Sequence, residues 1–140
     1  MSAEKNKQLM QTIFAEIATG SGALFAATLA DNVVMRVTGQ YSWSRTFTGK
    51  DAVMRDLYAY VRSLVERGSR TIPLNIFADG DHVIVEARGA MMTRTGQKYD
   101  NEYCLIYRFE GGKIVEMREY CDSLLCEERL GLFPGTEASP

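Results

Sequence analysis

Polar and aromatic side chains that could hold a small molecule occur in the second half of the chain. Between Tyr99 and Phe109 the sequence suits a strand, in which every second residue shares one face. Asn101 and Tyr103 fall on the face that also carries Leu105, and we expect them near the open end of a pocket. An amide and a phenol can hydrogen-bond a carbonyl or hydroxyl group. For a buried tyrosine, packing with one hydrogen-bond partner is the simpler explanation.

A second set of candidate ligand-binding residues lies in the first half of the chain. Arg36, Tyr41 and Trp43 alternate with apolar neighbours and could border the same pocket. Trp43 would then offer a flat stacking surface and Arg36 an anchor for an anion. Contacts at a dimer interface explain these residues equally well.

Residues suited to metal binding or nucleophilic catalysis are few. The single histidine, His82, follows a predicted turn and is best explained as a solvated residue at the start of a strand. Cys104, Cys121 and Cys126 lack the paired spacing of a metal site, and we expect reduced, buried thiols, as in a cytoplasmic protein. We therefore predict no metal and no cofactor.

The elements that must position these residues follow from hydrophobic periodicity. Apolar residues recur at helical spacing in three segments, residues 7–19, 23–29 and 51–67, and Thr48 with Asp51 resembles a capping box for the third. Residues 33–47 suggest two short strands or a bent hairpin. Four longer strands are expected at residues 71–78, 82–93, 99–109 and 113–122, separated by glycine-containing turns.

Helices followed by a meander of strands predict an α+β domain. We expect a cone in which a strongly curved antiparallel sheet wraps around three N-terminal helices and leaves an open mouth. This domain is assigned to residues 1–132, and a flexible C-terminal tail to the turn-rich residues 133–140.

Composition and charge exclude several kinds of partner. The 140 residues carry a formal net charge of −2, and Lys and Arg are scattered among Asp and Glu, which argues against nucleic acid as a partner. No apolar run is long enough to span a bilayer, and the polar N-terminus does not suit an export signal. We expect a cytoplasmic protein that does not associate with membranes.

Two segments resemble a known superfamily. The run from Leu105 to Ile114 (LIYRFEGGKI), followed by Arg118 to Asp122 (REYCD), resembles the strand ending of the nuclear transport factor 2 (NTF2)-like superfamily, in its SnoaL-like and ketosteroid isomerase-like branches. The segment FTGKDAV at residues 47–53 is also similar, and the resemblance covers about residues 7–130. The resemblance implies a cone-shaped fold, which in this superfamily is found in isomerases, epoxide hydrolases, cyclases, dehydratases, carriers and binding modules.

The resemblance singles out the end of the last strand. Tyr120 and Asp122 belong to the Glu-Tyr-x-Asp ending, and Asp122 is similar in place to the carboxylate lining the pocket of SnoaL-like cyclases and limonene epoxide hydrolase. An apolar wall would raise the pKa of this carboxyl and suit it to proton transfer. Alternatively, Asp122 caps the following segment, residues 123–127, whose first turn presents free amide donors.

Other family mechanisms fit less well. Arg88 could bridge Glu86 and Asp122, but an exterior Glu86–Arg88 pair of little energetic worth explains the spacing as well. Epoxide hydrolases of this fold use an aspartate on the comparable strand, and residues 83–93 contain none. The aspartate base and first-helix tyrosine of ketosteroid isomerases are also missing from the matching segments.

Two functions remain open. The first is a cofactor-independent isomerase, cyclase or dehydratase that acts on a small apolar carbonyl compound, with Asp122 as acid or base and Asn101 or Tyr103 steadying an oxyanion. The second is a non-catalytic small-molecule-binding or dimerisation module. In either case an apolar sheet face predicts a homodimer.

Overall fold

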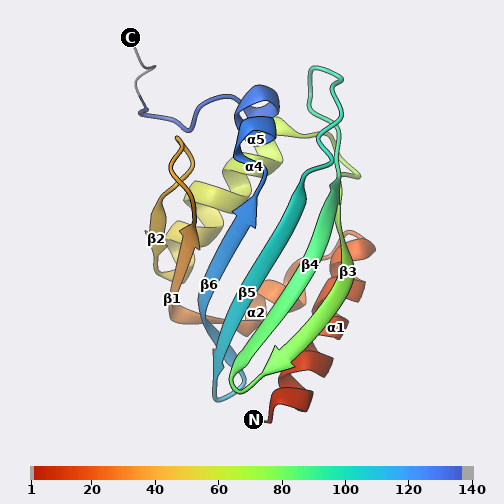
Figure 1. Ribbon diagram of the computed structural model, residues 1–140, viewed down its shortest axis with the longest axis vertical. Helices are drawn as coiled ribbons and strands as arrows, with labels where there is room; N and C mark the ends of the chain where they lie inside the picture. Colours follow the sequence, from red (N-terminus) through yellow and green to blue (C-terminus); the bar gives the residue numbers. More distant parts are fainter. Residues whose placement is uncertain (1, 137–140) are drawn as a thin grey trace.

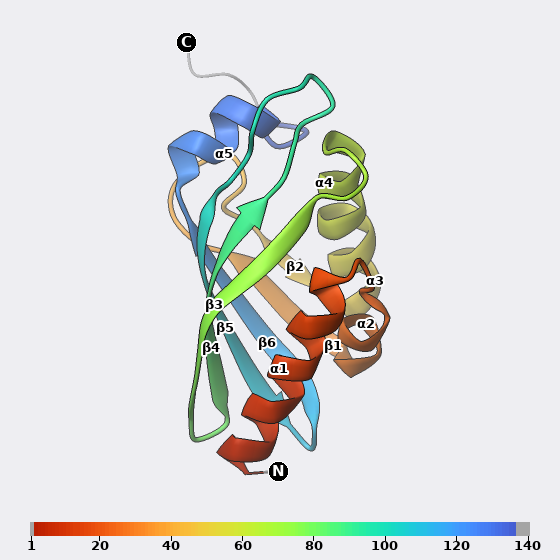
Figure 2. The ribbon, with the colours of Figure 1, turned by 90° about the vertical axis from the view of Figure 1, so that its right-hand side faces the viewer.

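The computed structural model describes residues 2–136 and contains one mixed six-stranded sheet with helices on one of its faces (Figures 1 and 2). Its strand order is β2-β1-β6-β5-β4-β3. The strands are β1 (Leu29–Val37), β2 (Thr46–Thr48), β3 (Arg70–Asp79), β4 (His82–Ala90), β5 (Glu102–Glu110) and β6 (Lys113–Cys121). The predicted α+β cone is confirmed, except that the pairing between β1 and β6 is parallel.

The helices form the second layer of the molecule. They are α1 (Ala3–Ala18), α2 (Ala23–Thr28), an uninterrupted helix composed of α3 (Lys50–Ala52), the π-helical turn η1 (Val53–Tyr58) and α4 (Ala59–Leu64), and finally α5 (Ser123–Leu130). Figure 2 shows α1 to α4 on one side of the sheet, with α5 across its upper end. The sheet and these helices therefore enclose the space between them from several sides.

The first helix forms where its periodicity predicts it. The Ser2 hydroxyl accepts a hydrogen bond from the Lys5 amide, which satisfies one free donor of the first turn. Met10, Ile13 and Phe14 make up its buried face against the core. Helical spacing alone was sufficient to predict this element.

The third predicted helix begins differently from its prediction. The capping box of Thr48 and Asp51 is absent, because the helix starts after Gly49, at φ +92°, without a side-chain cap. The π-helical turn from Val53 to Tyr58 was not predicted either. Such turns often occur at functional sites, and this one carries three of the residues that line the cavity described below.

The last two strands pair with an irregularity that decides which side chains face the helices. Phe109 pairs with Ile114, whereas Arg108 pairs with Glu116, so β6 carries one extra residue between them. Such a β-bulge reverses which face the following residues occupy. Beyond the bulge, Met117 is buried with Ile114, and Glu119 continues the inner row toward Cys121.

The chain end packs more closely than expected. Phe133 was assigned to the flexible tail, yet it is buried and its ring contacts those of Trp43, Phe47 and Tyr60. The packed domain therefore extends beyond residue 132. The last part of the predicted tail, residues 137–140, lies outside the described residues.

Candidate functional site

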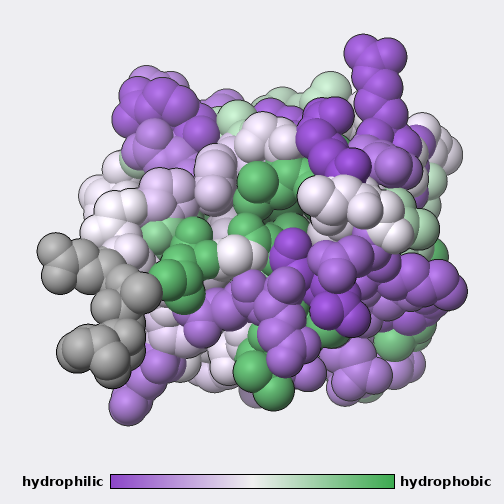
Figure 3. Space-filling model, turned by 90° about the horizontal axis from the view of Figure 1, so that it is seen from above, coloured by the Kyte–Doolittle hydropathy of each residue, from purple (hydrophilic) through white to green (hydrophobic). Residues whose placement is uncertain are grey.

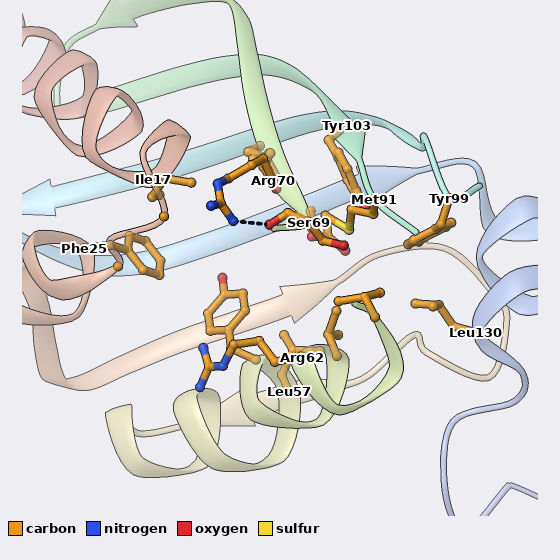
Figure 4. Close-up of a pocket in the computed structure, with 18 of the residues that line it drawn as sticks. Ile17, Phe25, Leu57, Arg62, Ser69, Arg70, Met91, Tyr99, Tyr103 and Leu130 are labelled. Atoms are coloured by element: carbon orange, nitrogen blue, oxygen red, sulfur yellow. Dashed lines mark hydrogen bonds between the residues drawn. The ribbon is translucent and has the colours of Figure 1, made fainter. Parts of the chain in front are cut away.

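A cavity of about 670 Å³ lies between the sheet and the helices. Its walls come from α1, α2, η1, α4, α5 and the inner face of the sheet, and most of the lining is apolar or aromatic. Figure 4 shows Ile17, Phe25, Leu57, Met91 and Leu130 around this space. The volume is in the range of pockets that hold small organic molecules.

Glu119 is the carboxylate on the strand wall of this cavity. The bulge in β6 turns it inward, where it lines the space close to four tyrosines. Burial raises its pKa to about 8, from an ordinary value of 4.5, because an apolar environment penalises the charged form. Within residues 2–136 its carboxyl group makes no hydrogen bond or ion pair with another side chain.

Five tyrosines line the cavity with Glu119, and the charge of Glu119 acts on four of them: Tyr41, Tyr58, Tyr103 and Tyr107. Burial raises the pKa of each phenol, and the charge of Glu119 raises it further. The phenols are therefore neutral at physiological pH and can donate hydrogen bonds. Together with a carboxyl group of high pKa, they form a set of proton donors in an apolar environment.

Two thiols lie beside this set. The Tyr41 hydroxyl and the Cys121 Sγ are 3.3 Å apart, and Cys126 lines the cavity from α5. Hydrogen bonds from Cys126 and Tyr41 lower the pKa of the Cys121 thiol, whereas the pKa of Cys126 is raised. All three cysteines are free.

Three of the sequence-predicted residues line the cavity: Tyr41, Trp43 and Tyr103. Trp43 has little surface left for a ligand, because it stacks on Tyr60 and its Nε1 donates to the Gly131 carbonyl oxygen at 2.9 Å. Tyr103 comes from the inner face of β5, as the alternation predicts. Tyr103 and Tyr41 are thus the predicted residues best placed to meet a ligand.

Asn101 lies on the predicted inner face but does not line the cavity. It is fully buried, and its Nδ2 donates to the Tyr99 hydroxyl and to the Asp122 carbonyl oxygen. Its Oδ1 accepts hydrogen bonds from the amides of Glu102 and Asp122. Because every polar atom of the amide is occupied, Asn101 has a structural role here.

Asp122 does not face the cavity. Its side chain is exposed, and its Oδ1 accepts a hydrogen bond from the Leu125 amide at 3.1 Å, as the N-cap of α5. The contacts therefore match the capping interpretation, and the proposed role in proton transfer loses its geometric basis. The β-bulge is the physical reason, since it directs Glu119 inward.

Four further candidates lie away from the cavity: Arg36, Glu86, Arg88 and Tyr120 are exposed and are not part of its lining. Glu86 accepts a hydrogen bond from Asn75 on the neighbouring strand β3. Arg88 forms a salt bridge neither to Asp122 nor to Glu86, although Glu86 and Arg88 both lie on the exterior of the sheet.

Sequence reasoning missed Glu119 and a group of arginines at the opening. A signal for Glu119 was available, because a carboxylate stood in the strand segment that the family resemblance had already singled out. The cavity is also lined by Arg62, Arg67 and Arg70, which lie in one stretch of the chain, and by Arg94 from the loop after β4. Nothing local in the sequence indicated that Arg94 would join the other three.

Within the described part of the chain, no group of three or more His, Cys, Asp or Glu side chains is arranged to hold a metal ion. Over the same residues, no helix combines the length and apolar character required to cross a bilayer.

The fold as a whole is similar to that of several solved structures. An NTF2-like protein from Burkholderia pseudomallei K96243 superposes with a TM-score of 0.77 at 19% identity, covering 93% of this chain and 98% of that one. A putative SnoaL-like polyketide cyclase from Jannaschia sp. CCS1 gives 0.75 at 16% identity, with 92% and 93% covered. A protein with a ketosteroid isomerase-like fold from Catenulispora acidiphila DSM 44928, solved in complex with trimethylamine, gives a TM-score of 0.71 at 15% identity, with 89% of this chain and 92% of that one covered.

The sequence itself relates the chain to a family. A search of curated protein sequences found no match. The profile of the SnoaL-like domain matches residues 10–117, which is more than half of the chain. This match runs from the middle of α1 to the middle of β6, and it agrees with the superpositions. The chain belongs to the SnoaL-like domain family, and its fold is similar to that of NTF2-like and ketosteroid isomerase-like structures.

Proposed function

We propose that this protein is a cofactor-independent proton-transfer enzyme that acts on a small, largely apolar carbonyl compound, with Glu119 as its acid–base residue. The observation that carries the proposal is the unpaired carboxyl group of Glu119 on the wall of an apolar cavity. A carboxyl with a pKa of about 8 is suited to proton transfer near neutral pH. Isomerase- and cyclase-type reactions belong to this class, and one similar structure is described as a putative polyketide cyclase.

In the proposed reaction the carboxyl group transfers the proton and a phenol stabilises the negative charge that develops. Ionised Glu119 removes a proton from the carbon next to the carbonyl group, and the negative charge moves to the carbonyl oxygen. A neutral phenol, such as Tyr58 or Tyr103, donates a hydrogen bond to that oxygen. Glu119 then returns the proton to another atom of the same molecule, which completes an isomerisation.

The test is exchange of the α-protons of 2-tetralone, a small apolar ketone, in D₂O, followed by NMR. We expect the wild-type protein to accelerate exchange, with a rate that rises with pH and levels off above about 8. Glu119→Gln should lose about a hundredfold or more of the enzymatic rate, as is typical when a general base is removed. Glu116→Gln makes the same change on the outer face of the same strand and should leave exchange intact.

Two results would speak against the proposal. Exchange that persists in Glu119→Gln would place the base elsewhere. Binding of 2-tetralone without any exchange in the wild-type protein would favour the alternative, a non-catalytic module that binds small molecules in the same cavity.

We also propose a reducing cytoplasm as the working compartment. The three free cysteines support this, because neighbouring thiols such as Cys121 and Cys126 would be prone to oxidation elsewhere. Location of a tagged copy of the full chain in cell fractions would test it.

A further inference from the structure

The opening of the cavity carries a concentration of positive charge. Four arginines line the cavity: Arg62, Arg67, Arg70 and Arg94. Because three of them are exposed and Arg70 is half-buried, they lie where the cavity meets solvent, and we call them the rim arginines. Within residues 2–136 none of them forms a salt bridge, and the acidic residue that lines the opening beside them is Glu66. The whole chain has a net charge of −2, so this local excess is not a property of the composition.

The rim arginines come from separate elements that the fold brings together. Arg62 belongs to α4, Arg67 to the following turn, Arg70 to the start of β3, and Arg94 to the loop after β4. Figure 4 shows Arg62 and Arg70 on opposite sides of the cavity. Seen from the end near α4 and α5, apolar surface is bordered by hydrophilic residues (Figure 3).

Two of the rim arginines are held by the backbone. Arg94 donates from Nε to the Ser63 carbonyl oxygen at 2.7 Å, and Arg70 donates from Nη1 to the Ser69 carbonyl oxygen at 3.0 Å. A Cβ atom at Gly20 would lie 2.9 Å from Nη2 of Arg70, and Gly20 adopts φ +99°. The absence of a side chain at Gly20 thus leaves room for the Arg70 guanidinium group. Among the residues that the structure describes, both arginines also keep N–H groups that donate to no carboxylate.

We propose that the rim arginines bind the anionic group of an amphipathic ligand whose apolar body fills the cavity. Guanidinium groups pair with carboxylates and other oxyanions through two parallel hydrogen bonds. An apolar cavity with a cationic rim fits an organic acid better than a neutral hydrocarbon or a cation. This inference rests on the proposed function in one respect: it makes the substrate an apolar carbonyl compound that also carries a carboxylate or similar group.

Calorimetric titration of the full chain with decanoate and with decanol tests the inference, because the two probes differ in the charge of one end. We expect decanoate to bind about tenfold more tightly than decanol at pH 7, as one charge-assisted interaction would provide. Added salt should weaken the binding of decanoate and leave that of decanol unchanged. Arg62→Ala and Arg70→Ala should each lose most of the preference.

The matched control is Arg36→Ala, which removes an exposed arginine from β1 outside the cavity lining. It should keep the full preference for decanoate. Equal affinity of the wild-type protein for both probes, no binding of either, or equal losses in Arg36→Ala and Arg70→Ala would overturn the inference. A change in thermal unfolding shows whether a variant has lost its fold, and Arg62 is exposed on a helix, so at least Arg62→Ala should fold normally.

The two proposals can fail separately. If Glu119→Gln binds decanoate as the wild-type protein does, but 2-tetralone shows no exchange in either, the anion site stands and the proton-transfer function falls. If exchange depends on Glu119 while decanoate and decanol bind equally, the function stands and the anion site falls.

Discussion

The side chain of Asn101 pairs with the backbone of Asp122 in both directions. Its Nδ2 donates to the Asp122 carbonyl oxygen at 3.0 Å, and its Oδ1 accepts from the Asp122 amide at 3.0 Å. This pairing joins the start of β5 to the junction between β6 and α5. Because α5 contributes Cys126 and Leu130 to the cavity, the amide of Asn101 helps to hold one of its walls.

Replacing Asn101 should therefore affect stability more than ligand chemistry. In Asn101→Ala the amide and carbonyl groups of Asp122 lose their side-chain partner, and we expect a loss of about 1–3 kcal/mol in the free energy of unfolding. Denaturant titration measures it. Asn101→Asp keeps the acceptor but loses the donor to the Asp122 carbonyl, so it should also be destabilised. A variant as stable as the wild-type protein would contradict this role.

Asp122 provides a contrasting prediction. As the N-cap of α5, it should tolerate Asp122→Asn with little loss, whereas Asp122→Ala should cost about 1 kcal/mol of stability. Neither variant should change the exchange of 2-tetralone, because the side chain does not line the cavity. Loss of exchange in Asp122→Asn, with the fold intact, would restore Asp122 as the acid–base candidate.

The outer face of the sheet leads to a prediction about assembly. On this face Ile106 lies between Ile84 of β4 and Arg118 of β6, and Tyr120 is 44% exposed. We still expect a homodimer through this face, which sedimentation at micromolar concentration would detect. Ile106→Glu should shift it to the monomer, because burying a charged side chain at the interface carries a desolvation cost that isoleucine does not. A monomeric wild-type protein would contradict the expectation.

The sequence was sufficient for most of the fold because strand and helix periods are local. The alternation along β5 correctly places Tyr103 on the inner face, and α1 follows its apolar spacing. The acid–base candidate Asp122 was taken from the family resemblance, which does not reveal the bulge in β6. Strict alternation from Ile114 would also place Tyr120 and Asp122 on the inner face, whereas the extra residue before Glu116 turns Glu119 inward. Nothing local in the sequence marks that extra residue.

The titration of Glu119 should be visible in the stability of the protein. Its pKa is raised from an ordinary 4.5 to about 8 in the folded state, so folding favours the protonated form. The carboxyl therefore costs nothing below about pH 4.5, and its ionisation destabilises the fold progressively between that pH and about 8. The slope would be at most about 1.4 kcal/mol per pH unit.

Glu119→Gln removes this contribution, because the amide does not ionise. We expect the variant to equal the wild-type protein in stability near pH 4 and to exceed it increasingly up to about pH 8, with a constant difference above that. Chemical denaturation at several pH values measures this difference. The control is Glu116→Gln: a hydrogen bond to Arg108 lowers the pKa of the Glu116 carboxyl, so this variant should not gain stability over the wild-type protein as the pH rises from 4 to 8. A difference between wild type and Glu119→Gln that did not change with pH would mean that the Glu119 carboxyl is ordinarily solvated, and the acid–base proposal would then lose its physical basis.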